Sequence, residues 1–199
     1  MPLDTLENTL THELSDLLSA ENQFAKALLT VAKNADSDEV RVMAQEHHAE
    51  TLQQIDNLKQ AFTILGSKPE RGLVCKAAQG LVEENSSTLK EEKPKGAIKD
   101  VVLLGGSLRI EHYEIAGYTA AISLAKSLGQ KEVVRILQTN LAQEKATAKK
   151  VEAATPALLL AASATPVTAP AAAKPAAKKA TASKATASKA APKKTTKAK

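Results

Sequence analysis

Four segments of the chain repeat apolar residues at helical spacing, and each apolar stripe is interrupted near its middle by a glutamate. These acids are Glu21, Glu50, Glu111 and Glu144. His47 precedes Glu50 by three residues and Glu114 follows Glu111 by three, so each pair shares one face of its helix. Six side chains that can bind a metal are therefore expected on the faces that must form the core.

Carboxylates at one level of an apolar core lose their hydration and repel one another. They persist there only when they are protonated, paired with cations or bound to metal. The stripes contain no lysine or arginine at this level, and Arg109 lies two residues before Glu111. Oxygen ligands with one imidazole favour iron or manganese. The sequence thus predicts a dinuclear site for two iron ions, with manganese as the alternative.

Each of these residues also has a simpler interpretation. A single glutamate in such a stripe more often lies at the edge of a bundle and points to water. His47 is as compatible with a supporting position behind the ligands as with metal binding. Tyr118, two turns after Glu111, is expected to pack in the core rather than to bond a ligand. Four helices with an acid at matching depth favour the metal site over coincidence.

The apolar stripes predict an all-α fold with few aromatic residues in its core. The long helices are expected over residues 3–33, 37–65, 97–127 and 130–154. The first pair and the last pair are joined by short connections, so each pair should form an antiparallel hairpin. The connection over residues 66–96 is long and is expected to contain a short helix near 73–90. Two hairpins joined by one long crossover are the connectivity of a ferritin-like four-helix bundle.

A change in composition near Pro156 predicts two parts, a bundle over residues 1–155 and a basic tail over residues 156–199. The tail holds nine lysines and no acid, so its formal net charge is +9, whereas residues 1–155 have a formal net charge of −4. It has little to bury and is expected to be disordered when alone. Its lysines suit non-specific nucleic-acid binding by counterion release, at Lys174, Lys178, Lys179, Lys184, Lys189, Lys193, Lys194, Lys197 and Lys199. A solubilising tail and binding to other anionic partners are the alternatives.

The remaining features concern the compartment. Cys75 is the only cysteine, which excludes an intramolecular disulfide and fits a reducing environment; it is expected to lie outside the bundle without a partner. The first residues show no signal peptide, and the apolar run 157–162 is too short for membrane insertion. The sequence predicts a cytoplasmic protein. The basic tail also suggests that the protein associates with the nucleoid.

Several sequence pieces resemble the YciF/YciE-like stress proteins of the ferritin-like superfamily, which are related to rubrerythrins. The resemblance covers about residues 4–152 and excludes the tail, which itself resembles linker-histone tails. The matching pieces are Glu13-Leu14-x-Asp16-Leu17, Ala20-Glu21-x-Gln23, Glu46-His47-x-x-Glu50-Thr51, Cys75-Lys76-Ala77-Ala78-Gln79-Gly80-Leu81, Arg109-x-Glu111-His112-Tyr113-Glu114-Ile115-Ala116-x-Tyr118 and Glu144-Lys145-Ala146-Thr147.

The resemblance implies a homodimeric, rubrerythrin-like bundle with a di-iron site. Its ligands would be Glu21, His47, Glu50, Glu111, Glu114 and Glu144. The chain departs from the wider di-iron pattern at two places. His47 precedes its glutamate instead of following it, and Thr147 stands where a second histidine is usual.

Three functions are compatible with this sequence. The first is a stress-related protein, with ferroxidase- or peroxidase-type oxidoreductase activity, that handles iron and peroxide at a di-iron site while its tail binds nucleic acid. The second is a non-catalytic nucleoid-associated protein in which two basic tails bridge DNA. The third is a di-manganese, catalase-like oxidoreductase.

Overall fold

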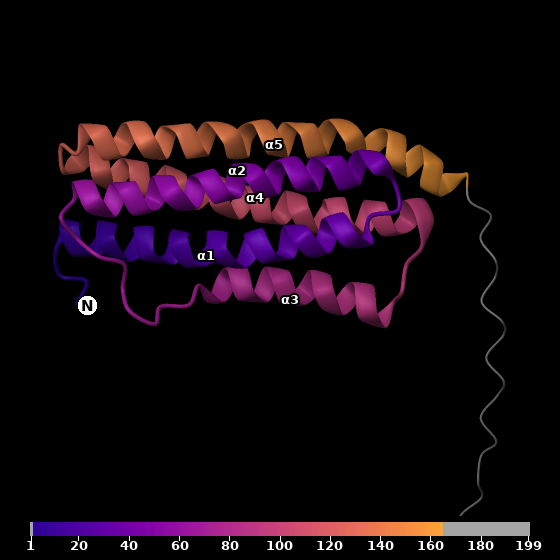
Figure 1. Cartoon of the computed structure of the whole chain (residues 1–199), viewed down its shortest axis with the longest axis horizontal. Helices are drawn as coiled ribbons and strands as arrows, with labels where there is room; N and C mark the ends of the chain where they lie inside the picture. Colours follow the sequence, from indigo (N-terminus) through magenta and orange to yellow (C-terminus); the bar gives the residue numbers. More distant parts are fainter. Residues whose placement is uncertain (1, 165–199) are drawn as a thin grey trace, which may run out of the picture. The chain divides into compact units, whose positions relative to one another are not determined.

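A computed structural model of the chain describes residues 2–164. Four long helices lie side by side as a bundle, and a shorter helix runs along one face of it (Figure 1). The described residues contain no strand. The helices are α1 (Leu6–Asn34), α2 (Asp38–Ile64), α3 (Lys76–Glu91), α4 (Gly96–Ser127) and α5 (Lys131–Ser163).

The two predicted hairpins are confirmed. Helices α1 and α2 pack along each other, as do α4 and α5, and each pair is joined by a tight turn. The hydroxyls of Thr5 and Ser37 accept backbone N–H bonds at the starts of α1 and α2, which fixes where these helices begin. Gly129 adopts a φ of 68° in the second turn, a left-handed conformation that glycine adopts without strain.

The long crossover is also confirmed, and its helix α3 packs against α1 and α4. Ala78 is the residue of α3 that is fully buried; it contacts an apolar cluster that includes Phe24 of α1 and Ile110 of α4. Gly106 makes room for this packing, because a Cβ there would lie 2.6 Å from the side chain of Asn85. The crossover therefore covers the α1/α4 face of the bundle.

Two aspartates tie the first turn to the start of α4. Asp100 is buried, and its two carboxylate oxygens accept the backbone N–H groups of Asp36 and Ser37 at 2.9 and 2.8 Å. Asp36 in turn accepts the N–H of Gly96 at 2.6 Å and forms an ion pair with Lys99 at 2.7 Å. The Lys99 ammonium is the main reason that the pKa of Asp36 lies below its ordinary value. These bonds fix one end of the crossover against the first hairpin.

The last helix is longer than predicted. Residue 154 was expected to end it because Pro156 follows, but α5 continues through Pro156 to Ser163. Proline removes a backbone N–H and costs helix stability. Leu158 and Ala162 beyond it are both buried, and Leu158 joins an apolar cluster with Val31 and Leu104. Burial of these side chains offsets the cost, so the first residues after Pro156 belong to the bundle.

All nine tail lysines, Lys174 to Lys199, lie outside the described residues, as does most of the predicted tail. Within residues 2–164, no helix is both long and apolar enough to cross a membrane.

Candidate metal centre

The acidic residues lie between two apolar clusters that fill the two ends of the bundle. The first cluster contains Leu10, Leu14, Leu17, Leu58, Phe62, Tyr118 and Leu137. The second contains Val31, Val40, Leu103, Leu104, Val151 and Leu158. On each long helix the predicted acid falls between residues of the two clusters. The four glutamates that interrupt the apolar stripes therefore lie at the same level of the bundle, as predicted.

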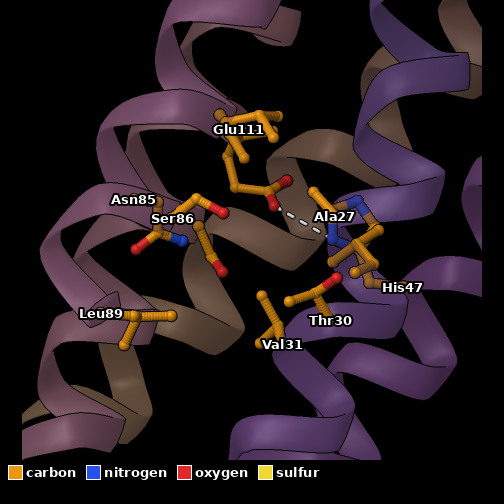
Figure 2. A pocket seen from close by; sticks show the side chains of 12 residues that line it. Ala27, Thr30, Val31, His47, Asn85, Ser86, Leu89 and Glu111 are labelled. Carbon is orange, nitrogen blue, oxygen red and sulfur yellow. Dashed lines mark ion pairs between the residues drawn. The ribbon is translucent and has the colours of Figure 1, made fainter. Parts of the chain in front are cut away.

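Four of the six predicted residues converge at this level. His47, Glu111, Glu114 and Glu144 each present one potential ligand atom, and all these atoms lie within 4.8 Å of one another. His47 Nδ1 lies 3.2 Å from Glu111 Oε1, and His47 Nε2 lies 3.7 Å from Glu144 Oε2. Figure 2 shows the first of these contacts as a dashed line. Three different helices thus supply one compact cluster.

Glu21 and Glu50 lie beside the four-residue cluster in different environments. Glu21 is fully buried, and it accepts a hydrogen bond from the hydroxyl of Tyr118. The side chain of Glu50 keeps 32% of its surface exposed. It accepts a hydrogen bond from Thr147 at 3.1 Å and lies 3.9 Å from the ammonium of Lys150. Glu21 therefore extends the buried group, whereas Glu50 connects it to the surface.

Amide groups support this cluster from the side of the first apolar cluster. Gln54 donates from its side-chain amide to Glu144. Asn140 donates to the Tyr118 hydroxyl at 2.9 Å and to the backbone carbonyl of Gln54 at 3.3 Å, and it accepts from Asn57 at 2.7 Å. Such second-layer bonds hold ligand side chains in fixed orientations.

Many potential ligand atoms of the cluster have no hydrogen-bond partner among residues 2–164. They are both carboxylate oxygens of Glu111 and Glu114, one oxygen each of Glu21 and Glu144, and His47 Nε2. The 3.2 Å contact between His47 and Glu111 lacks the geometry of a hydrogen bond. Buried polar atoms are normally paired, so a concentration of unpaired acceptors requires a cation or protons. No buried residue in the described part of the chain is a lysine or arginine.

Protons fill this role when metal is absent. Burial, and then the charge of Glu144, raises the pKa of Glu21 to about 8. Burial and the neighbouring carboxylates, chiefly Glu144, raise the pKa of Glu111 to about 10. Burial and then the charges of Glu21, Glu144 and Glu111 raise the pKa of Glu114 well above its ordinary value. The donors are hard carboxylate oxygens and one imidazole, which suit iron or manganese. The residues present thus fit a bound metal ion in charge and in chemistry.

Of two sequence predictions about nearby residues, the core packing of Tyr118 is confirmed and the prediction for Cys75 is wrong. Tyr118 does pack in the core, but it also bonds Glu21, so it is more than a packing residue. Cys75 was expected to lie outside the bundle without a partner. It is buried under α3, where its Sγ lies 2.9 Å from the Tyr113 hydroxyl and accepts the N–H of Ala78. Tyr113 donates to Asp16 at 2.8 Å, so the thiol serves as a bonded cap of α3.

Sequence analysis did not assign Gln54 and Asn140 to the site. A signal for both was present, because Gln54 follows Glu50 by four residues and Asn140 precedes Glu144 by four. Each amide therefore lies on the same helix face as a predicted ligand, one helical turn away from it.

The bundle, its crossover and its central carboxylates define a ferritin-like protein. The structure of a dodecameric thioferritin from Bacteroides fragilis shares the fold with a TM-score of 0.61 at 17% identity, over 79% of this chain and 91% of that one. The chain belongs to the family described as a domain of unknown function, DUF892, whose model matches residues 5–164.

Its relatives include Protein YciF of Escherichia coli strain K12, which is 32% identical over 147 residues, or 74% of this chain and 88% of YciF. The crystal structure of that E. coli stress protein superposes with a TM-score of 0.76, at 31% identity, over 79% of this chain and 99% of YciF. YcfI from Rhodopseudomonas palustris gives a TM-score of 0.72 at 36% identity, over 76% and 97% of the two chains. The predicted membership in the YciF-like, ferritin-like group is confirmed.

Proposed function

We propose that the bundle binds two iron ions and uses them to handle iron and peroxide under stress. The ligands in this proposal are Glu21, His47, Glu50, Glu111, Glu114 and Glu144. The observation that carries it is the set of buried ligand atoms without hydrogen-bond partners, gathered from all four long helices. Two divalent ions carry the charge that neutralises the four fully buried glutamates, and no buried lysine or arginine in residues 2–164 competes for this role.

The residues of the chain have separate parts in this function. When bound, the metal ions would supply redox chemistry with a peroxide or with oxygen. Glu111, Glu114 and Glu144 would hold the ions, and Glu111 and Glu114, whose pKa values are raised, would release their protons as the ions bind. Tyr118 and Gln54 orient Glu21 and Glu144 by hydrogen bonds. The two apolar clusters exclude water from both ends of the centre.

The test is the metal content of protein purified without chelator and then exposed anaerobically to Fe(II) or Mn(II). We expect about two ions per chain in the wild type and a large loss in the Glu111→Gln/Glu144→Gln double variant. A matched control is Glu132→Gln/Glu152→Gln, which changes two exposed glutamates of α5. Equal metal content in all three proteins, or none in any, would refute the proposal.

The same loaded protein separates the oxidoreductase alternatives. Peroxide consumption that depends on added Fe(II) supports iron handling. Turnover of peroxide by the manganese-loaded protein without Fe(II) would instead support the catalase-like alternative, and no consumption at all would leave a structural metal.

We also propose that the lysine-rich segment binds nucleic acid without sequence preference. The support is its charge of +9, set beside a bundle that carries −4. Removal of residues 165–199 should abolish binding to duplex DNA and leave the metal content unchanged. Because binding would depend on counterion release, it should weaken steeply with salt. Loss of both properties in the truncated chain would contradict the separation of the two parts. Homodimer formation, a cytoplasmic location and nucleoid association stay predictions.

A further inference from the structure

A pocket between α1, α3 and α4 leads to the His47 and Glu111 side of the cluster. Figure 2 shows its walls: Ala27 and Thr30 come from α1, and Asn85, Ser86 and Leu89 from α3. Thr30 is exposed and the three α3 residues are half-buried, whereas His47 and Glu111 at the inner end are buried. The pocket therefore connects the surface near the crossover helix with the buried acids.

The lining of this pocket is neutral except at its inner end. Glu111 is the one carboxylate among the lining residues of the described chain, and none of them is a lysine or arginine. Alkyl groups form most of the wall, with the hydroxyls of Thr30, Ser86 and Ser107 and the amide of Asn85 between them. The cavity measures about 40 Å³, which holds two or three molecules of the size of water. A hydrated metal ion is too large and too charged for such a wall.

The opposite side of the bundle has a different character. Helices α2 and α5 pack on each other, and their outer face lies across the bundle from the α1/α4 face that α3 covers. A groove there is lined by Asp38, Glu39, Glu46 and Lys150. Lys150 lies 3.8 Å from Glu46 and 3.9 Å from the half-exposed Glu50, which borders the cluster. Acidic groups thus approach the centre from the α2/α5 side, and neutral groups from the α3 side.

We propose that the pocket between α1, α3 and α4 is the route of a small neutral oxidant, hydrogen peroxide or dioxygen, to the His47/Glu111 side of the centre. The crossover helix is then more than a connection, because Asn85, Ser86 and Leu89 set the width of the oxidant's route. This inference rests on the proposed function, since it assigns an access route to the same centre.

Three variants of the full-length chain test the route. Ser86→Leu places a larger side chain in the pocket, and Leu89→Ala widens it. Ser87→Leu is the matched control, because it makes the same change at the next position of α3, outside the lining. Metal content is measured first in every variant and should equal that of the wild type. The rate at which the Fe(II)-loaded protein reacts with hydrogen peroxide, and separately with dioxygen, is then measured by stopped flow.

We expect Ser86→Leu to slow the reaction by about tenfold or more, as for a narrowed access step. Leu89→Ala should accelerate it or leave it unchanged, and Ser87→Leu should have no effect. An effect on only one of the two oxidants would assign the route to that oxidant. Unchanged rates in Ser86→Leu with normal metal content would overturn the route while leaving the proposed function in place.

A second measurement does not depend on metal. Crystals of the metal-free protein under xenon pressure should hold a xenon atom in this pocket, since small apolar cavities bind xenon. The Ser86→Leu protein should lose that site and Ser87→Leu should keep it. Absence of xenon from the wild-type pocket would contradict an open route. Failure of every protein to take up metal would instead refute the proposed function, and the route's role with it.

Discussion

Helix α4 carries buried carboxylates in two contrasting environments. Asp100, near its start, has each oxygen bonded to a backbone N–H of the first turn, at 2.9 and 2.8 Å. Glu111 and Glu114, three and four turns later, are equally buried, yet none of their four oxygens has a hydrogen-bond partner among residues 2–164. The protein itself satisfies the first carboxylate, and it leaves the others to protons or to a cation. The difference separates a structural acid from acids that await a ligand.

The largest expected effect concerns pH in the metal-free protein. Glu21 and Glu111 have pKa values of about 8 and about 10 in the folded chain, against an ordinary value of 4.5. The folded state therefore holds protons that the unfolded chain releases, and its stability falls as pH rises from about 4.5 toward 8 and 10.

Thermal unfolding of metal-free protein at a series of pH values measures this effect. The midpoint should fall between about pH 5 and pH 8, and the fall should be shallower in Glu111→Gln, in which one titrating group is removed. Metal-loaded protein should show the opposite trend, because bound ions hold the carboxylates ionised. If the unfolding midpoint fell equally steeply with pH in the wild type and in Glu111→Gln, groups other than Glu111 would hold these protons.

The next largest effect tests the structural acid. Asp100→Ala removes the acceptor of the Asp36 and Ser37 N–H groups, and hydrogen bonds to a charged group contribute about 1.5–3 kcal/mol each. Chemical denaturation should show a loss of about 3–6 kcal/mol in the free energy of unfolding, while metal content stays normal. Glu111→Gln should do the reverse at neutral pH: it should remove metal without destabilising the metal-free protein. If the two variants had the same effects on stability and on metal content, the distinction between Asp100 and Glu111 would be contradicted.

A smaller effect is expected at the second layer of the centre. Tyr118→Phe removes the donor to Glu21 and should weaken metal binding by about 10- to 100-fold, as for other second-layer changes. Tyr113→Phe is the control, because Tyr113 lies on the same helix but bonds Asp16 and Cys75 instead. Competition with a chelator measures both affinities. Equal losses of metal affinity in the two variants would show that the bond from Tyr118 to Glu21 is not the cause.

The smallest effect is expected at the exposed edge. Thr147→Val deletes the 3.1 Å bond to Glu50, a side chain that is 32% exposed. Water can replace the lost donor there, so the change in metal affinity should stay below about 1 kcal/mol, or a few-fold. A loss as large as that of Tyr118→Phe would mean that Glu50 is drawn into the buried cluster when metal binds.

Sequence analysis predicted the helices and their pairing because apolar spacing and short turns are local properties. The acids interrupting the stripes also predicted where His47, Glu111, Glu114 and Glu144 would meet. Three features were beyond its reach because they depend on distant partners. In the sequence, Asp100 does not differ from other acids near the start of a helix. Its bond to the Asp36 N–H is evident only once the fold places the first turn beside it. The burial of Cys75 depends on α3, and the continuation of α5 past Pro156 depends on the pocket that Leu158 fills.

The division of the centre between the two hairpins has a consequence for how the chain folds. The first hairpin carries Glu21, His47 and Glu50, and the second carries Glu111, Glu114 and Glu144. Each hairpin forms from contacts close in sequence, which form fast, and neither contains the whole group of acids. Repulsion between Glu144 and the two glutamates of α4 begins within the second hairpin, whereas Glu21 joins these carboxylates only when the hairpins dock, after the crossover loop has closed. Docking and the formation of the second hairpin are therefore the steps that pH and metal supply should accelerate or delay, while the formation of the first hairpin should be indifferent to both.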